Sequence, residues 1–209
     1  MTVSTLENEE VRIHGEQLLD IARNSSLAEA IFFLLTARKP TEQENHLFEK
    51  MLLVTLDHGP DTTSSATSRF VISGGNELNV GVGAGILSIG DFHGGAIEPA
   101  MEFFYQLEKI SSAERKEIIT KKITTKEIIF GFGHKIYKEE DPRVTFLRKE
   151  CTQIGYVSSY FTITDEILQL FNEFKGRIIP LNIDGCIAAL LCSMNIDSRL
   201  GKGVFIIGR

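Results

Sequence analysis

The chain has 209 residues, of which 43% are hydrophobic and 24% charged, and its formal net charge at pH 7 is −6. These values are ordinary for a soluble globular protein, and the length indicates a single domain over residues 1–209. The negative charge excludes a global basic footprint for nucleic acid, so an anionic substrate must be held by local cations. No apolar run reaches the roughly 18 residues that a membrane span needs.

The three cysteines are odd in number and form no CxxC pair. They indicate reduced thiols in a cytoplasmic protein, because disulfide frameworks and zinc sites use paired or regularly spaced cysteines. The N-terminal sequence MTVSTLENEEVRIHGEQ is acidic and has no apolar core, so no signal peptide is expected.

Apolar residues repeat at helical spacing through most of the chain and almost never alternate with period two, which predicts an all-α fold. The first strong helix is predicted at 27–38 and ends before Pro40, because a residue before proline disfavours the α conformation. Thr41 then begins a capping box with Glu44 that opens a helix at 42–56. Further helices are predicted at 62–73, 77–89, 95–109, 112–121, 143–153, 164–174, 184–194 and 199–207.

Two helix starts and two irregular runs complete the secondary-structure prediction. Ser111 and Thr164 are the predicted N-caps of two helices. Only YVSSYFTI at 156–163 and VFI at 204–206 read as strand-like. A small lobe of about residues 108–176, hinged against the rest, is expected within the single domain.

Glycine is concentrated in one part of the chain, where nine of the eighteen glycines fall between Gly59 and Gly95. Glycine inside a helix costs about 1 kcal/mol relative to alanine, so this cluster indicates close helix crossings or backbone approach to a ligand. The run GVGAGILSIG at 81–90 lacks the GxGxxG spacing and a preceding strand, so it predicts a tight helix contact rather than a dinucleotide loop.

Five polar residues stand in segments that suit chemistry: His58 in LDHGP, His93 in GDFHGGA, His134 in GFGHK, Arg143 in DPR and Asp184 in LNIDG. Arg143 is expected to open a helix with its guanidinium free. Taken singly, each has a structural interpretation, with the histidines as satisfied core residues, Asp184 as an N-cap and Arg143 as a salt-bridge partner. No HxxxH or CxxC spacing supports a metal site, and none is expected.

Taken together and in order, these segments resemble the citrate synthase family. GFGHKIYKEEDPR at 131–143 is similar to the family signature, and GDFHGGAIEPAMEFF to the segment of its first catalytic histidine. LDHG resembles its substrate-binding motif, and LNIDG the N-x-D of its catalytic aspartate. The likeness runs from about Val11 to Arg209. The compact form, with LDHGP and SGGNELNVGVGAGILSIGD, is more similar to citryl-CoA lyase and the citrate-synthase-like module of ATP-citrate lyase.

The resemblance implies a citrate synthase-like helical fold, with a large helical region and a small lobe, that forms or cleaves the C–C bond between acetyl-CoA and oxaloacetate. Asp184 would take the α-proton of the acyl-CoA, and His93 would donate a hydrogen bond to the enolate as a neutral imidazole. His134 would polarise the ketone of oxaloacetate. In the cleavage direction, His134 would accept the hydroxyl proton of citryl-CoA and Asp184 would protonate the acetyl-CoA enolate.

The resemblance also implies a set of binding residues. His58, Arg143 and Arg209 would bind the substrate, the two arginines through its carboxylates. A coenzyme A thioester would be the substrate, and no tightly bound cofactor is expected. The residues expected to meet the coenzyme, through close backbone approach or through its phosphates, are Gly131, Gly133, Lys135 and Lys138.

Several alternatives stay open. Citryl-CoA lyase chemistry is favoured by the short chain and by LDHGP, with citrate synthase, or a relative that uses another acyl-CoA or 2-oxo acid, close behind. A non-catalytic CoA-binding paralogue is an alternative of another class. The family's later arginine, donated across the dimer, has no counterpart here, so a partner subunit that supplies the C-terminal residues is a further alternative. A homodimer is expected, with 77–89 and 95–109 as candidate interface helices and intrachain packing as the other interpretation.

Overall fold

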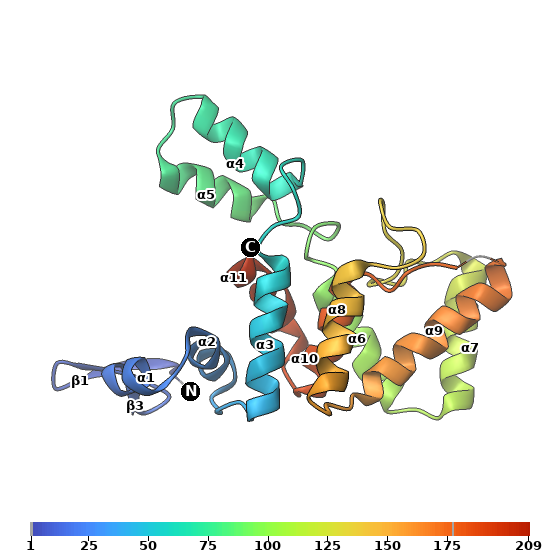
Figure 1. Ribbon diagram of the computed structural model, residues 1–209, viewed down its shortest axis with the longest axis horizontal. Helices are drawn as coiled ribbons and strands as arrows, with labels where there is room; N and C mark the ends of the chain where they lie inside the picture. Colours follow the sequence, from blue (N-terminus) through green and yellow to red (C-terminus); the bar gives the residue numbers. More distant parts are fainter. Residues whose placement is uncertain (1, 177) are drawn as a thin grey trace. The chain divides into compact units, whose positions relative to one another are not determined.

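The computed structural model describes residues 2–176 and 178–209 and contains, within them, eleven α-helices, a short 3-10 helix and one small sheet (Figure 1). The predicted all-α class is therefore confirmed. No helix in those ranges combines the length and apolarity needed to cross a membrane. Backbone contacts divide the chain into two units, one ending at Met51 and one spanning Leu52–Arg209. The expected lobe of about residues 108–176 lies inside the second unit, and its separateness stays a prediction.

The first unit begins with a three-stranded antiparallel sheet, in the order β1-β2-β3, that the sequence did not predict. Its strands are β1 (Ser4–Glu7), β2 (Glu10–Ile13) and β3 (Glu16–Gln17). Asn8 and Glu9 turn the first hairpin with positive φ angles of 49° and 67°. Every residue of β1 is exposed, so the strand carries no alternating apolar face from which it could be recognised.

Three helices follow the sheet: α1 (Leu18–Asn24), α2 (Leu27–Thr36) and α3 (Glu42–Thr55). The predicted capping box of α3 is confirmed, because Thr41 Oγ1 accepts from the Glu44 backbone N–H at 3.2 Å and Glu44 Oε2 accepts from the Thr41 N–H at 2.8 Å. Arg38 also donates to the Glu44 carboxylate, at 2.6 Å. The α2–α3 turn is therefore fixed by the predicted pair Thr41 and Glu44, together with Arg38.

The second unit is helical throughout, and its predicted helices are confirmed with small changes at their ends. Ser111 caps α7, as predicted. Thr164 is not an N-cap, because α9 begins at Ser159 and Thr164 lies buried inside it. The helices are α4 (Thr63–Ser73), α5 (Leu78–Leu87), α6 (Ile97–Glu108), α7 (Ser112–Thr125), α8 (Pro142–Gln153), α9 (Ser159–Lys175), α10 (Ile183–Ser193), the 3-10 helix η1 (Ser198–Leu200) and α11 (Gly201–Gly208).

Both strand-like runs were wrong predictions. In 156–163 the chain turns helical at Ser159, and 204–206 belongs to α11. Tyr160, Ile163 and Ile167 of α9 are 8, 3 and 0% exposed. Their spacing places them on one helical face, so burial of that face outweighs the β propensity of the individual residues.

The core of the second unit lies where α6 packs against α10. In α10, residues 187–191 are all at most 1% exposed. In α6, Ile97, Met101, Phe104 and Leu107 are fully buried. This packing holds the first turn of α10 in place and covers the apolar side of α6 within the chain. The expectation that 95–109 is an interface helix stays a prediction.

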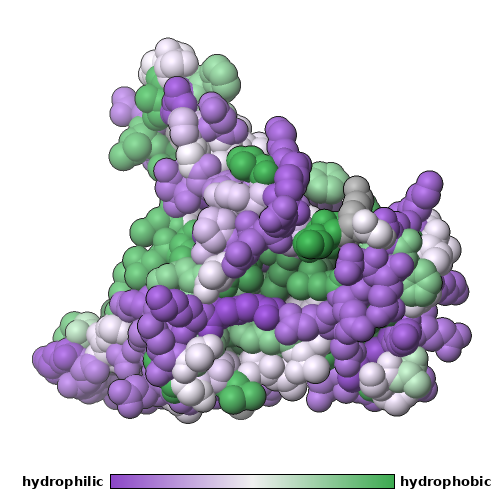
Figure 2. Space-filling model, turned by 45° about the vertical axis from the view of Figure 1, so that its right-hand side comes forward, coloured by the Kyte–Doolittle hydropathy of each residue, from purple (hydrophilic) through white to green (hydrophobic). Residues whose placement is uncertain are grey.

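Helices α4 and α5 form an antiparallel hairpin whose close approach depends on glycine (Figure 1). A Cβ added at Gly85 would lie 2.2 Å from Ser68 Oγ and 3.2 Å from the Ser64 carbonyl oxygen. The predicted tight helix contact is therefore confirmed. Figure 2 shows the other sides of the hairpin, at the top of the view, with hydrophobic side chains on the surface among hydrophilic ones.

Two glycine substitutions in α5 test this contact. Gly85→Ala should lower the free energy of unfolding by about 1–3 kcal/mol, because the methyl group has no space against α4. Gly83→Ala, with nothing within 4 Å of its added Cβ, should raise it by about 0.5–1 kcal/mol through helix propensity. Urea unfolding of the two variants measures both effects. Equal stability of the two variants would contradict the close contact.

Candidate functional site

A cavity of about 450 Å³ in the second unit brings the candidate residues together. Its wall combines titratable side chains from five separate parts of the chain with apolar groups such as Ala96, Ile183 and Phe205. Residues predicted for the site that line it are His58, His93, Gly131, Gly133, His134, Lys135, Arg143, Asp184 and Arg209. Lys138 does not line it.

The loop that leads to His134 lies directly on the start of α10. Phe132 and Leu181 form an isolated antiparallel bridge, flanked by hydrogen bonds from Gly133 N–H to the Pro180 carbonyl at 2.7 Å and from Asn182 N–H to the Gly131 carbonyl at 3.0 Å. Gly131 has a φ of +91°, and a Cβ there would lie 2.6 Å from Gly185 Cα. Glycine is needed here for contact between two backbones.

His134 has a defined tautomer. Its Nδ1 accepts hydrogen bonds from the backbone N–H groups of Ile136 and Tyr137, both at 3.1 Å. Since those groups can only donate, the proton of the neutral ring lies on Nε2. The ring stacks on Tyr137 with centroids 4.6 Å apart. Burial lowers the pKa of His134, and the nearby Arg143 lowers it further, so the ring is a neutral donor near pH 7.

His93 is held in the opposite tautomer. Its Nε2 lies 2.8 Å from Ser64 Oγ and 3.4 Å from the Ser64 backbone N–H, in the first turn of α4. Because the backbone N–H can only donate, Nε2 accepts and Nδ1 carries the proton. Burial, followed by the charge of Arg209, lowers the pKa of His93. His93 is therefore a second neutral donor.

Asp184 occupies the first turn of α10, one residue before Gly185, which meets the His134 loop. Asn182 caps this helix, with its Oδ1 accepting from Gly185 N–H at 3.1 Å. Burial raises the pKa of Asp184 to about 6, although Arg143 and the Gly94 N–H favour its charged form. A carboxyl group with such a pKa can give or take a proton near neutral pH.

The guanidinium of Arg143 is not free, which corrects the prediction. Its Nε and Nη2 donate to the two carboxylate oxygens of Asp141 at 3.0 and 2.8 Å, and Asp141 is fully buried. Asp141 also accepts from the Arg143 backbone N–H at 3.1 Å and caps α8. The pair fixes the orientation of Arg143 and leaves its Nη1 without a hydrogen bond to the described residues.

The side chain of Arg209 is a buried cation whose hydrogen-bond donors are not all satisfied by the described residues. Only 8% of its side chain is exposed, and its Nε and Nη1 make no hydrogen bond to the described residues. The carboxylate of Asp57 lies 3.8 Å from Nη1, and the ring of Phe205 lies 5.2 Å from the guanidinium carbon. Burial lowers the pKa of Arg209. Because buried charged groups are normally paired, this guanidinium indicates an anion-binding position.

His58 completes the group of imidazoles. Its ring lies 5.6 Å from that of His134. Its ring nitrogens make no hydrogen bond to the described residues, whereas its backbone N–H donates to Asp57 Oδ1 at 2.8 Å. Burial lowers the pKa of His58, and the charges of Arg143 and Arg209 lower it further. Its tautomer, unlike those of His93 and His134, is not fixed by the protein.

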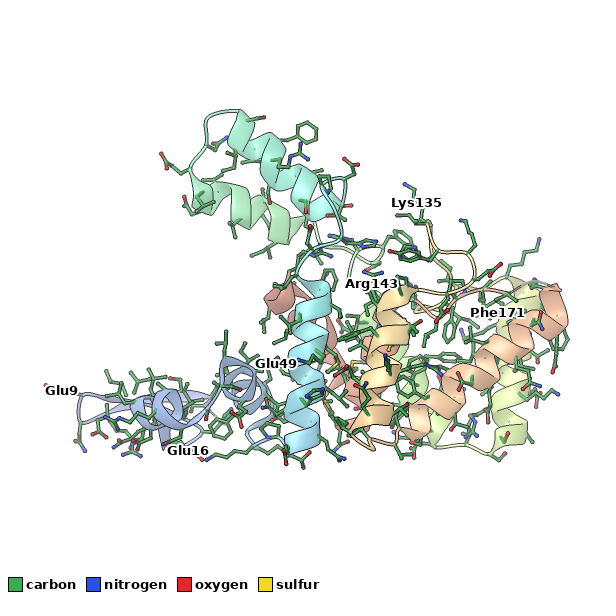
Figure 3. All side chains as sticks on the ribbon, viewed as in Figure 1. Glu9, Glu16, Glu49, Lys135, Arg143 and Phe171 are labelled. Carbon is green, nitrogen blue, oxygen red and sulfur yellow. The ribbon has the colours of Figure 1, made fainter. Side chains whose placement is uncertain are left out.

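The two lysines differ in position. Lys135 is exposed at the mouth of the cavity, in the loop that precedes α8 (Figure 3). Lys138 donates to the Lys135 carbonyl at 2.7 Å and so stabilises the loop itself. Within residues 2–176 and 178–209, no three His, Cys, Asp or Glu side chains are grouped to hold a metal ion.

The sequence did not identify Ser64, Asp141 or Tyr137 as part of the site. Asp141 and Tyr137 lie within the signature segment itself, but only their contacts with Arg143 and His134 assign them a role. Ser64 gave no signal, because its partner His93 is distant in the chain and is reached only through the α4–α5 hairpin.

The chain is similar in sequence to known proteins of one family. The family model described as citrate synthase, C-terminal domain, matches residues 2–209. Citrate synthase 2 of Bacillus subtilis is 29% identical over 199 residues, which are 93% of this chain and 52% of that protein. The chain spans about half the length of the first curated relatives it matches.

Solved structures match the whole chain. A citryl-CoA lyase from Hydrogenobacter thermophilus is 38% identical with a TM-score of 0.94, covering 100% of this chain and 81% of that one. An ATP citrate lyase from Methanothrix soehngenii, in complex with citrate and coenzyme A, is 26% identical with a TM-score of 0.86, covering 100% and 36%. The resemblance and the fold expected from it are confirmed, and the chain belongs to the citrate synthase family.

Proposed function

We propose that the chain is a citryl-CoA lyase, an enzyme of the citrate synthase type that cleaves citryl-CoA to acetyl-CoA and oxaloacetate. The observation that carries the proposal is one cavity that contains a carboxyl group with a pKa of about 6, two imidazole donors of fixed tautomer and a buried arginine with two nitrogens that make no hydrogen bond to the described residues. The likeness to the citryl-CoA lyase of Hydrogenobacter thermophilus supports the choice of substrate.

The arginines would bind the carboxylates of the citryl group. Arg209 has two buried nitrogens that make no hydrogen bond to the described residues, so a carboxylate that accepted from them would remove the cost of leaving these donors unsatisfied. Arg143 offers Nη1, and its pairing with Asp141 holds the guanidinium rigid. Charge-assisted hydrogen bonds from the two arginines would orient a dicarboxylate in a chain of net charge −6.

Asp184 and His93 would act on the acetyl half. As the C–C bond breaks, its electrons form the enolate of acetyl-CoA. The Nδ1–H of His93 would donate to the enolate oxygen, and loss of one such donor typically costs about 10²–10³ in rate. Protonated Asp184 would give its proton to the enolate carbon and become a carboxylate.

His134 and His58 would act on the hydroxyl group that becomes the ketone. The Nε2–H of His134 suits donation to that oxygen, as expected for polarising the ketone. The expected acceptance of the hydroxyl proton by His134 would require Nε2 to be unprotonated, and the two N–H bonds to Nδ1 oppose that tautomer. His58 has unengaged nitrogens, so we assign the hydroxyl proton to His58, which balances the proton released by Asp184.

The coenzyme would enter past the 131–135 loop. Gly131 and Gly133 remain the proposed points of backbone approach, and Lys135 at the cavity mouth suits a phosphate better than Lys138 does. The coenzyme A thioester would be a substrate, and no tightly bound cofactor is proposed. The buried free thiols of Cys151, Cys186 and Cys192 support the proposed cytoplasmic location.

Citrate synthase activity is the second candidate. It is favoured by the curated relatives, several of which are named citrate synthase. Both activities need the same groups and differ in whether citryl-CoA is hydrolysed. A non-catalytic CoA-binding role is disfavoured by the presence of an acid, imidazoles and arginines in one cavity. A need for a partner subunit would appear as activity only after a second chain is added.

Substitution of the proposed acid tests the function. Asp184→Asn keeps size and hydrogen bonding but cannot donate a proton to the enolate, so kcat for citryl-CoA cleavage should fall about 10²–10⁴-fold. Oxaloacetate release measures the rate. Asp20→Asn, an exposed control in α1, should leave kcat unchanged. Wild-type turnover by Asp184→Asn would refute the assignment.

The pH dependence follows from the same residue. Cleavage needs Asp184 protonated, so kcat/KM for citryl-CoA should fall as pH rises through about 6, and Asp184→Asn should lack this limb. Cleavage neither releases nor takes up a proton overall. The value of kcat/KM in the condensation direction should therefore fall over the same pH range. A basic limb near pH 4, the range of an ordinary carboxyl group, would contradict a raised pKa.

We also propose a homodimer that uses exposed apolar side chains of the α4–α5 hairpin. Phe70, Leu78 and Leu87 are 78, 75 and 88% exposed. Large apolar side chains grouped on one hairpin are typical of an interface. Light scattering should give twice the chain mass, and Leu87→Glu should shift the protein toward the monomer. A monomeric wild type across micromolar concentrations would exclude this interface.

A further inference from the structure

We infer that Asn182 is a positioning residue that sets the separation of Asp184 and His134 with its side-chain amide. Its Oδ1 accepts from Gly185 N–H at 3.1 Å, and its Nδ2 donates to the Gly133 carbonyl at 2.9 Å. The first bond lies in the turn of α10 that carries Asp184. The second lies on the residue directly before His134. One planar group therefore joins the two elements that carry the proposed chemistry.

The amide extends a backbone pairing that stops short of His134. The bonds from Gly133 N–H to Pro180 and from Asn182 N–H to Gly131 hold the loop as far as residue 133. Beyond them, Gly133 has a φ of +83° and nothing within 4 Å of the place of a Cβ, so packing does not restrain that side of it. The bond from Asn182 fixes the Gly133 carbonyl and, with it, the peptide plane that enters His134.

An asparagine side chain is needed because the junction requires an acceptor and a donor at once. Aspartate of the same shape would still cap α10, but would set an oxygen against the Gly133 carbonyl oxygen. Serine would also cap α10, but its shorter single hydroxyl cannot span both partners. The two roles of Asn182, in capping and in joining, can therefore be separated by substitution.

The consequence for catalysis rests on the proposed function. Asp184 and His134 would act on the two fragments joined by one C–C bond, so their spacing has to match that bond. Misplacement of a reacting group by about 1 Å can cost about 10²-fold in rate. A loop that is loosened but not detached should lower kcat more than it weakens substrate binding.

The kinetic experiment compares Asn182→Asp and Asn182→Ser with a capping control. Both variants should lower kcat for citryl-CoA about 10–100-fold while KM stays within about threefold. Ser111→Ala removes the N-cap of α7 and should lower stability without changing kcat. Folded variants with wild-type kcat would overturn the inference, as would an equal loss in Ser111→Ala.

Amide hydrogen exchange tests the positioning role of Asn182 without any assay of activity. Loss of the bond to Gly133 should speed exchange in residues 131–137 on the order of fivefold in both Asn182 variants, and leave it unchanged in Ser111→Ala. If the wild type did not cleave citryl-CoA, the proposed function would fail, while the exchange rates would still test the positioning role of Asn182. Wild-type exchange in both Asn182 variants would refute the positioning role.

Discussion

The structure of the site depends on a contact between two glycine backbones, Gly131 in the loop before His134 and Gly185 in the first turn of α10. On the present backbone, a Cβ added at Gly131 would lie 2.6 Å from Gly185 Cα, and one added at Gly185 would lie 2.4 Å from the Gly131 carbonyl oxygen. No side chain can separate the two elements. His134 and Asp184 are therefore brought together by main chain, and the buried α6–α10 core supports the helix from behind.

The electrostatics of the site have a different origin, because they depend on which charges the fold leaves unpaired. Arg143 is neutralised by Asp141, whereas Arg209 is buried with two donors unused. Burial lowers the pKa of His58, His93 and His134, and the charge of Arg143 at His58 and His134, or of Arg209 at His58 and His93, lowers it further. Burial also raises the pKa of Asp184 to about 6. An anionic substrate would accept hydrogen bonds from Arg209 in the same cavity that the neutral imidazoles line.

The sequence predicted most helices and singled out residues that line one cavity, but it did not predict the contacts among them. The period of apolar residues located helices such as α6 and α10, because their buried faces repeat every three to four residues. Motif likeness identified His93, His134 and Asp184. Local spacing could not show that Ser64 sets the tautomer of His93, since the contact forms only through a distant hairpin.

Other errors have local causes. The guanidinium of Arg143 was expected to be free, although Asp141 two residues earlier in the same motif binds it. The strand-like run at 156–163 became helical because its apolar residues reach the core at helical spacing. The short N-terminal sheet is exposed and carries no periodic signal. Each error arises where a tertiary contact or solvent exposure outweighs the intrinsic preference of the residues.

The central claim is that this cavity cleaves citryl-CoA, and identification of the products tests it most directly. The purified chain would be incubated with citryl-CoA and the mixture analysed by mass spectrometry against a protein-free control. Acetyl-CoA and oxaloacetate in equal amounts are the predicted result. Citrate and free coenzyme A above the control would contradict lyase activity and favour a synthase, and unchanged citryl-CoA would contradict the proposed activity of this chain.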